Sequence, residues 1–207
     1  MRKRSETTRA VIIAAAKELF LSQGYVVTTV EAIAERANMT KRTIYGYFPD
    51  KRSLFKGVIE QSVGDPWEFH IPLEGIATVK GVRNALFAIS QGIEEIITQP
   101  DYVQLLRVTI AEIPTQPDLS ILFERGATRR SYRAVAGLLK TAGMHGVVTF
   151  KDSDVAAQQF VGGFVMRVFL DGLLHAKPVV TRQTNQQLAD YVDDFLGRLI
   201  SSGQEAG

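Results

Sequence analysis

The 207-residue chain contains no cysteine, only three histidines and a single tryptophan. Without cysteine there are no disulfides, thiolate metal sites or cysteine nucleophiles, which is compatible with a reducing compartment. His70, His145 and His175 are far apart in the sequence and lack carboxylate partners at metal-ligand spacing. We therefore predict that the protein uses neither a metal nor another cofactor.

Long apolar runs are also missing. No segment approaches the roughly 18 to 20 apolar residues of a membrane span, and the most apolar helix is interrupted by Arg167 and Asp171. The basic N-terminus and the run AVIIAAA share features with a secretory signal, but Lys17-Glu18 ends that run and no clean cleavage site follows. These features predict a cytoplasmic protein without a membrane partner.

Recognisable catalytic motifs are absent as well. The sequence contains no P-loop, no GxGxxG and no arrangement from which a Ser-His-Asp triad can be argued. We therefore predict that the protein is not an enzyme.

Charge is distributed unevenly along the chain. Residues 1–56 hold 11 Lys and Arg against 5 Asp and Glu, a net charge of +6, whereas residues 57–207 hold 13 against 17, a net charge of −4. A locally basic domain attracts a polyanion through counterion release. The N-terminal quarter is therefore the predicted polyanion-binding part. Arg2-Lys3-Arg4 is either an arm that enters a DNA groove or a solvated tail.

Residues 28–51, TTVEAIAERANMTKRTIYGYFPDK, have the pattern of two short helices joined by a tight turn. Thr28 or Thr29 is expected to cap the first helix, and Thr28-x-x-Glu31 fits a capping box. Asn38 tolerates the left-handed geometry at which this helix ends, and Thr40 caps the second helix. The second helix then begins with a basic, polar turn.

At these residues the sequence resembles the TetR family of bacterial transcriptional regulators. The resemblance runs from Ile12 to about Phe55. Two positions depart from it: Asn38 stands where the family usually has Gly, and Arg42 stands where it commonly has a small residue or Pro. The matching positions are Ile12-Ile13, Ala16, Leu19-Phe20, Gly24, Thr28-Thr29, Ile33-Ala34, Ala37, Thr40, Thr43-Ile44-Tyr45, Tyr47-Phe48, Lys51 and Leu54.

The resemblance implies that the second helix reads double-stranded DNA. Lys41 and Arg42, in its first turn, are expected to reach major-groove acceptors, and Arg suits a bidentate contact to guanine. Tyr45 is carried over as a base or backbone contact. The phosphate contacts carried over are Thr28, Thr29, Thr43, Tyr47 and Lys51. An alternative is that the tyrosines only pack and the threonines only cap. The predicted DNA-binding set is Thr28, Thr29, Thr40, Lys41, Arg42, Thr43, Tyr45, Tyr47 and Lys51.

The predicted fold is all-α, with about nine helices and no strand. We expect a helix-turn-helix DNA-binding domain at 1–50, a connecting helix at 51–64, and a helical effector-binding and dimerisation domain at 65–207. Outside the two helices of 28–51, the expected helices are 6–22, 51–63, 78–99, 102–113, 118–142, 152–175 and 185–202.

The last two helices favour a homodimer. The helix at 152–175 is apolar almost all round, so two opposite faces require cover, and the helix at 185–202 carries a stripe of Leu188, Val192, Phe195 and Leu199. An ordinary intramolecular core is the alternative. Arg107 and Arg167, set inside apolar helices, are expected to be buried and therefore paired.

A small-molecule effector is expected in the C-terminal domain, because apolar and aromatic walls with few polar groups are typical of ligand pockets. A basic stripe at Arg125, Arg129 and Arg133 is either a solvated face or a site for an anion or a partner's acid. The candidate pocket residues are Trp67, Phe87, Gln91, Leu106, Arg107, Tyr132, Phe160 and Phe164.

Together these features predict a ligand-responsive repressor that binds a palindromic operator as a homodimer and is released by its effector. The alternatives are a helical small-molecule carrier or enzyme that does not bind DNA, and a peripheral membrane protein that uses its basic N-terminus. Salt-dependent, palindrome-selective DNA binding separates the first prediction from the others.

Overall fold

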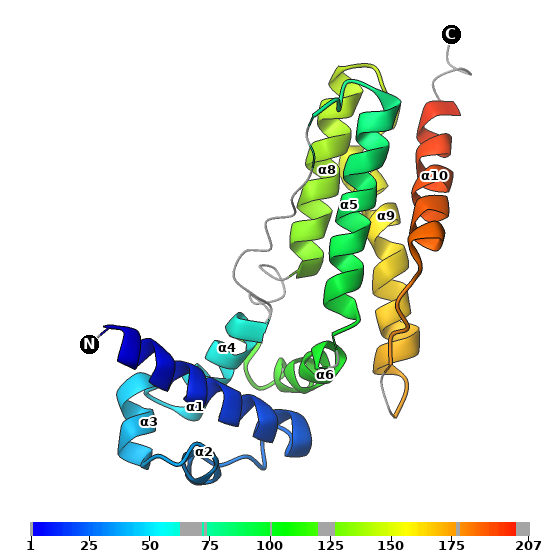
Figure 1. The fold of residues 1–207 in the computed structure, drawn as a ribbon. Helices are drawn as coiled ribbons and strands as arrows, with labels where there is room; N and C mark the ends of the chain where they lie inside the picture. Colours follow the sequence, from blue (N-terminus) through cyan, green and yellow to red (C-terminus); the bar gives the residue numbers. More distant parts are fainter. Residues whose placement is uncertain are drawn as a thin grey trace. The chain divides into compact units, whose positions relative to one another are not determined.

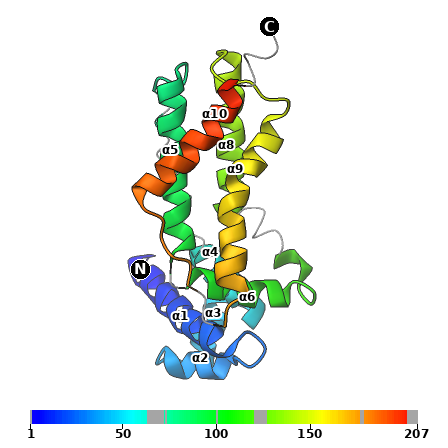
Figure 2. The same cartoon turned by 90° about the vertical axis from the view of Figure 1, so that its right-hand side faces the viewer.

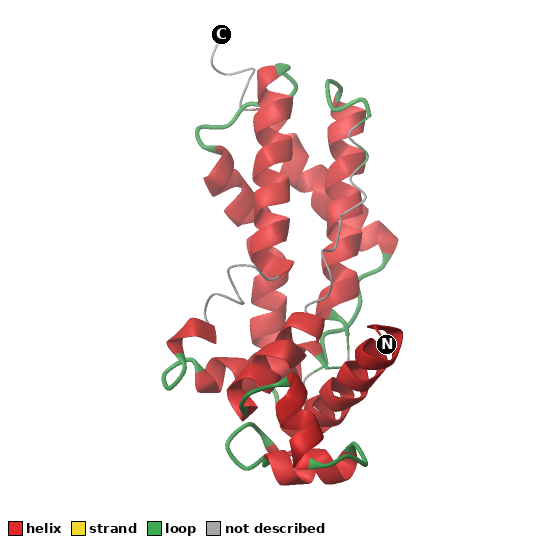
Figure 3. Ribbon diagram, turned by 90° about the vertical axis from the view of Figure 1, so that its left-hand side faces the viewer, coloured by secondary structure: helices red, strands yellow, loops and turns green. Residues whose placement is uncertain are grey.

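The computed structural model describes residues 2–62, 72, 74–99, 101–119, 127–176 and 179–201. These residues form nine α-helices, one 3-10 turn and one π-helical turn, and none of the residues in these ranges forms a strand (Figure 3). This confirms the predicted all-α fold. Within the same ranges, no helix combines the length and the apolar character needed to cross a membrane.

The described chain divides into two compact units. The first contains residues 2–62 and 104–119, and the second contains the remaining described residues. The first unit therefore includes an internal segment, residues 104–119, that lies in the sequence between helices of the second unit. Residues 104–119 comprise most of α6 (Tyr102–Glu112) and the 3-10 turn η1 (Pro117–Leu119).

The N-terminal part of the first unit contains α1 (Arg2–Gln23), α2 (Val30–Arg36), α3 (Lys41–Tyr47) and α4 (Lys51–Ser62) (Figure 1). Gly24 ends α1 in the left-handed region with φ 84°, and its amide donates to the carbonyl of Phe20 at 3.0 Å. Gly24 is therefore the left-handed residue that ends α1, a conformation that glycine adopts without strain. Helix α1 begins at Arg2, four residues before the predicted start.

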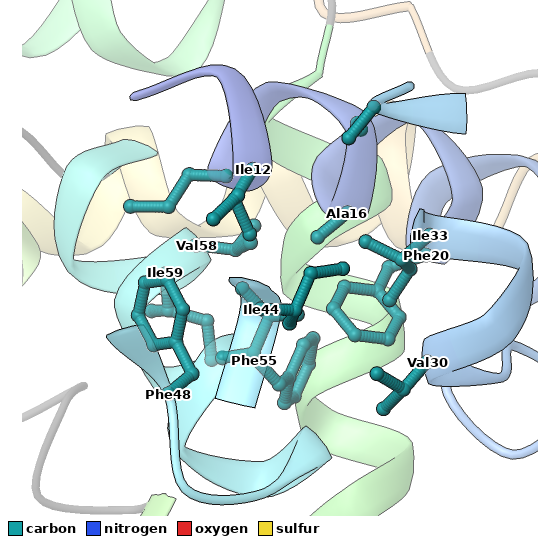
Figure 4. Packing of buried hydrophobic residues seen from close by; sticks show 14 of the residues in the cluster. Ile12, Ala16, Phe20, Val30, Ile33, Ile44, Phe48, Phe55, Val58 and Ile59 are labelled. Atoms are coloured by element: carbon teal, nitrogen blue, oxygen red, sulfur yellow. The ribbon is translucent and has the colours of Figure 1, made fainter. Parts of the chain in front are cut away.

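A single apolar core holds the first unit together. Phe20 is completely buried and its ring meets that of Phe55 edge to face, with centroids 5.0 Å apart. Leu105 and Leu119 from the internal segment belong to the same cluster. Figure 4 shows the part of this core contributed by α1 to α4: Ile12, Ala16, Phe20, Val30, Ile33, Ile44, Phe48, Phe55, Val58 and Ile59.

The second unit is built on α5 (Val79–Ile97), α8 (Ala127–Met144), α9 (Ser153–Arg167) and α10 (Asn185–Ser201). Helix α8 packs against both α5 and α9, and α10 packs against α5 (Figure 2). The predicted stripe on α10, Leu188, Val192, Phe195 and Leu199, is buried. Phe195 meets Phe160 of α9 with ring centroids 4.9 Å apart.

Two predicted helices differ from the observed ones. The helix predicted at 118–142 is observed as α8, which begins only at Ala127. The start of the predicted range lies in η1, and residues 120–126 lie outside the described residues. The helix predicted to run through His175 is α-helical only to Arg167 and continues as the π-helical turn η2 (Val168–Leu173). Gly172 in that turn packs closely on Val103, where an added Cβ would lie 2.9 Å from a methyl group. Such long-range contacts leave no local pattern in the sequence.

A buried ion pair fixes the chain after η2. Arg167 pairs with Glu94 of α5, whose side chain is 0% exposed, and donates to the carbonyl of Thr181 at 2.6 Å. The backbone amide of Gln183 donates to the second Glu94 carboxylate oxygen at 3.0 Å. Arg167 is therefore paired, as predicted, and Arg107 is half-buried.

Candidate nucleic-acid interface

A tight turn joins α2 to α3. Asn38 lies in the left-handed region with φ 52°, and the amide of Met39 donates to the carbonyl of Ala34 at 2.8 Å. Helix α2 ends at Arg36 with Ala37 as its C-cap. Asn38 is thus the left-handed turn residue that the sequence predicted, because a short polar side chain tolerates this conformation better than most.

Threonine hydroxyls start both helices. Thr29 accepts a hydrogen bond from the amide of Ala32 at 3.1 Å, and Thr40 accepts one from the amide of Thr43 at the same distance. The predicted capping box at Thr28-x-x-Glu31 is wrong, because Thr29 is the cap. The Thr28 hydroxyl instead donates to the carbonyl of Gly24 at 2.7 Å, and the side chain is buried.

The first turn of α3 is exposed and basic. Lys41 and Arg42 are both exposed, and the hydroxyls of Thr40 and Thr43 lie 2.9 Å apart beside them. Lys41 is paired with Glu31 of α2. Their hydrogen bond is the main cause that raises the pKa of Lys41 and lowers the pKa of Glu31, so both are charged at neutral pH.

The two tyrosines of α3 differ in exposure. Tyr45 is 49% exposed, whereas Tyr47 is half-buried and packs against the apolar core of the first unit. Ile44 and Phe48 are buried. Tyr45 is therefore accessible on this face. Tyr47 packs against the core, which agrees with the alternative that the tyrosines only pack.

Lys51, the first residue of α4, lies against the connection between α1 and α2. Its ammonium nitrogen donates to the carbonyls of Tyr25 at 2.9 Å, Val26 at 3.3 Å and Thr28 at 2.9 Å. Asp50 caps α4 by accepting from the amide of Ser53 at 2.6 Å. Asp50 therefore acts as the N-cap of α4.

The candidate effector residues are divided between the two units. Leu106 and Arg107 belong to the first unit, whereas Phe87, Gln91, Tyr132, Phe160 and Phe164 belong to the second. Trp67 lies outside the described residues, as does Arg125 of the predicted basic stripe.

The second-unit candidates have contacts of their own. Phe160 and Phe164 are buried and pack on Tyr191 with ring centroids 5.4 and 5.3 Å away. The Tyr132 hydroxyl donates to the carbonyl of Asp154 at 2.8 Å, and Gln91 donates to the Asn185 side chain at 3.3 Å. Phe87 is half-buried. Phe160 and Phe164 therefore have the contacts of core residues. Over the described ranges, no group of three or more His, Asp or Glu side chains is arranged to hold a metal ion.

Two family descriptions match the chain. Residues 12–58 match bacterial regulatory proteins of the tetR family, and residues 84–198 match the C-terminal domain of an AefR-like transcriptional repressor. The fold and the exposed helix-turn-helix define a DNA-binding transcriptional regulator, which is not an enzyme class. The chain belongs to the TetR family of regulators.

Individual proteins agree with this assignment. The chain is 40% identical over 73 residues to the HTH-type transcriptional regulator HbdR from Aromatoleum sp. (strain CIB), covering 34% of this chain and 31% of that protein. The matched stretches span only 27% to 44% of the curated relatives' own length.

Solved structures share the fold along nearly the whole chain. A TetR transcriptional regulator from Agrobacterium tumefaciens aligns with a TM-score of 0.76 at 19% identity, covering 97% of this chain and all of that one. The flavonoid-responsive regulator FrrA aligns with a TM-score of 0.72 at 24% identity, covering 95% and 97%. At these identities the likeness concerns the fold alone.

Proposed function

We propose that the protein is a cytoplasmic, ligand-responsive repressor that binds a two-fold symmetric operator as a homodimer. The observation that carries the proposal is the first turn of α3, where Lys41 and Arg42 are exposed beside the hydroxyls of Thr40 and Thr43. Cations and hydroxyls at the start of a recognition helix supply phosphate contacts and base-edge readout together.

Each residue of this face has a proposed role. Arg42 reads a base, since its side chain is exposed and its planar fork matches guanine O6 and N7. Lys41 leaves its ion pair with Glu31 and binds a DNA acceptor instead. Tyr45 contacts a base edge or the DNA backbone, and Thr29 contacts a phosphate beside the N-terminus of α2. Thr28, which is buried, supports the face from within.

The homodimer is supported by exposed apolar side chains on α9 and η2. Helix α9 buries Phe160, Val161 and Phe164 inside its own unit, whereas other apolar side chains of α9 and η2 are exposed. The side chains of Val155, Val165, Met166, Phe169, Leu170 and Leu174 are each 45% to 62% exposed. Apolar side chains gathered in this way are typical of a protein interface. A two-fold axis would pair this surface with its own copy and present two α3 helices to two half-sites.

Repression and effector release extend the same proposal. One matching description is that of a repressor's C-terminal domain, and one structural relative, FrrA, is named a flavonoid-responsive regulator. We propose a small-molecule site within the second unit, with Phe87, Gln91 and Tyr132 as candidate contacts. Effector binding would change the separation of the two recognition helices, which must match half-sites about 34 Å apart. Effector binding then weakens operator binding, and operator binding weakens effector binding by the same coupling free energy.

DNA selection from a random pool with the purified protein tests the central proposal. An enriched inverted repeat whose half-sites lie about one helical turn apart is the expected result. A carrier without DNA binding would enrich nothing.

Analytical ultracentrifugation of Phe169→Lys alongside the wild type tests the dimer, with Val179→Lys, an exposed position outside α9 and η2, as a control. The first variant should be monomeric and the control should remain dimeric.

A further inference from the structure

The first turn of α3 is in contact with an anion. Lys41 pairs with the Glu31 carboxylate of α2, and the two side chains are 49% and 58% exposed. Arg42 and the hydroxyls of Thr40 and Thr43 belong to the same turn. Glu31 therefore lies on the face that is proposed to meet DNA, although the phosphates of DNA repel a carboxylate.

Other carboxylates of the same unit have different surroundings. Glu18 pairs with Arg36, the last residue of α2, at a nitrogen–oxygen distance of 2.6 Å. Asp50 accepts from the amide of Ser53 at the start of α4. Neither contact involves the first turn of α3. Helix α2 also has its cap without Glu31, because the Thr29 hydroxyl accepts from the amide of Ala32. Capping of α2 therefore does not explain a carboxylate at position 31.

The charges of Glu31 and Lys41 match the major-groove edge of a G·C base pair. Guanine presents two acceptors there, O6 and N7, and cytosine presents the N4 amino donor beside them. A lysine donates to the guanine acceptors, and a carboxylate accepts from cytosine N4. In an A·T pair the adenine N6 amino group lies between two acceptors, adenine N7 and thymine O4, so a carboxylate that reaches N6 also meets an acceptor on each side.

The ion pair is easily exchanged for contacts with DNA. Exposed ion pairs contribute little to stability, so Lys41 leaves Glu31 at small cost when a guanine or a phosphate replaces the carboxylate. Glu31 then lacks its cation beside a polyanion, and a base amino group is the hydrogen-bond donor that DNA itself supplies. The cost of DNA binding to Glu31 therefore depends on the sequence that it faces.

We propose that Glu31 is a specificity-determining residue, which selects a G·C pair together with Lys41 by accepting a hydrogen bond from cytosine N4. The proposal deepens the proposed DNA-binding function and rests on it. On a sequence without that amino group Lys41 still binds phosphates, but Glu31 loses its cation and gains no donor. An unpaired charge that penalises the wrong partner is a general source of specificity. Glu31 thus weakens binding to most sequences and favours those that supply the donor.

DNA selection from a random pool tests the base preference. We would compare the wild type with Glu31→Ala and with Glu18→Ala, which removes an equal charge of similar exposure from an ion pair of the same unit. Glu31→Ala should lose the preference for G·C at one position of each half-site and keep the others. Glu18→Ala should enrich the wild-type site. An unchanged site in Glu31→Ala would overturn the proposal.

Fluorescence anisotropy measures the discrimination itself. The ratio of affinities for the selected site and for a mixed-sequence duplex should fall at least about fivefold in Glu31→Ala, the low end of what a base-edge contact contributes. Glu31→Gln, whose amide oxygen still accepts from N4 without a charge, should keep part of the preference and bind the mixed duplex more tightly than the wild type does. If Glu31→Ala and Glu18→Ala change the ratio equally, Glu31 acts only through net charge and the proposal is wrong.

The same selection separates this inference from the function on which it rests. If the wild type enriches no sequence, the proposed DNA-binding function fails and the role of Glu31 fails with it. If the wild type enriches an inverted repeat and Glu31→Ala enriches the same repeat with the same base preferences, DNA binding stands and only the role of Glu31 is refuted. Circular dichroism of each variant verifies that it is folded before its DNA binding is compared.

Discussion

Removing the Arg167 guanidinium should destabilise the second unit far more than removing that of Arg83. Both arginines pair with a carboxylate of the same unit, but Glu94 is 0% exposed whereas Asp193 is 50% exposed. Losing one partner of a buried pair costs about 3–5 kcal/mol, since the remaining charge is uncompensated, whereas an exposed pair contributes about 0.2–1 kcal/mol.

The size of the effect follows from the remaining contacts of Glu94. In Arg167→Met the apolar stem is kept, and the carboxylate retains only the hydrogen bond from the Gln183 amide among those described above. We therefore expect a loss of about 3 kcal/mol, at the lower end of that range. This corresponds to a decrease of about 10 °C in the unfolding temperature. Arg83→Met, the control, should lose less than about 1 kcal/mol despite its bidentate pair with Asp193.

Urea unfolding followed by circular dichroism measures both losses. The double variant Glu94→Gln/Arg167→Met removes both charges and keeps an acceptor for the Gln183 amide, so it should recover most of the stability lost in Arg167→Met. If Arg167→Met costs no more than Arg83→Met, or if the double variant is no more stable than Arg167→Met, Glu94 is not a buried charge held by Arg167.

Three further predictions concern the DNA-binding unit. Arg42→Ala should cost about 1–3 kcal/mol of operator binding and relax one base position; equal weakening on all sequences in a selection experiment would contradict base readout. Thr40→Ala should lower the free energy of unfolding by about 1 kcal/mol, whereas Thr40→Asn, which keeps a capping oxygen, should cost little in the same urea titration. The amide of Ser53 lowers the pKa of Asp50 from 3.8, so the cap is charged above that value and is lost as the pH falls through the lowered pKa. The stability difference between wild type and Asp50→Ala, measured by urea unfolding at several pH values, should therefore shrink in acid; a difference independent of pH would exclude the charged cap.

Much of the helix-turn-helix was predictable because its signals are local. A cap at Thr40, a left-handed Asn38 and inward-facing Ile44 and Phe48 depend on residues within one or two turns of each other. The predicted bounds of α4, α5, α6 and α10 also lie within two residues of the observed ones, since Pro, Gly and capping residues flank them.

The sequence alone determined that the chain is helical, that its N-terminal quarter is basic and that α3 opens with Lys41 and Arg42. Tertiary structure alone decided that residues 104–119 join the first unit, that Arg167 pairs with Glu94, and that Lys51 points at three backbone carbonyls. Capping and periodicity act over a few residues and leave a readable pattern. The hydrogen bonds that make these contacts join residues 23 to 83 positions apart, and only the folded chain brings such residues together.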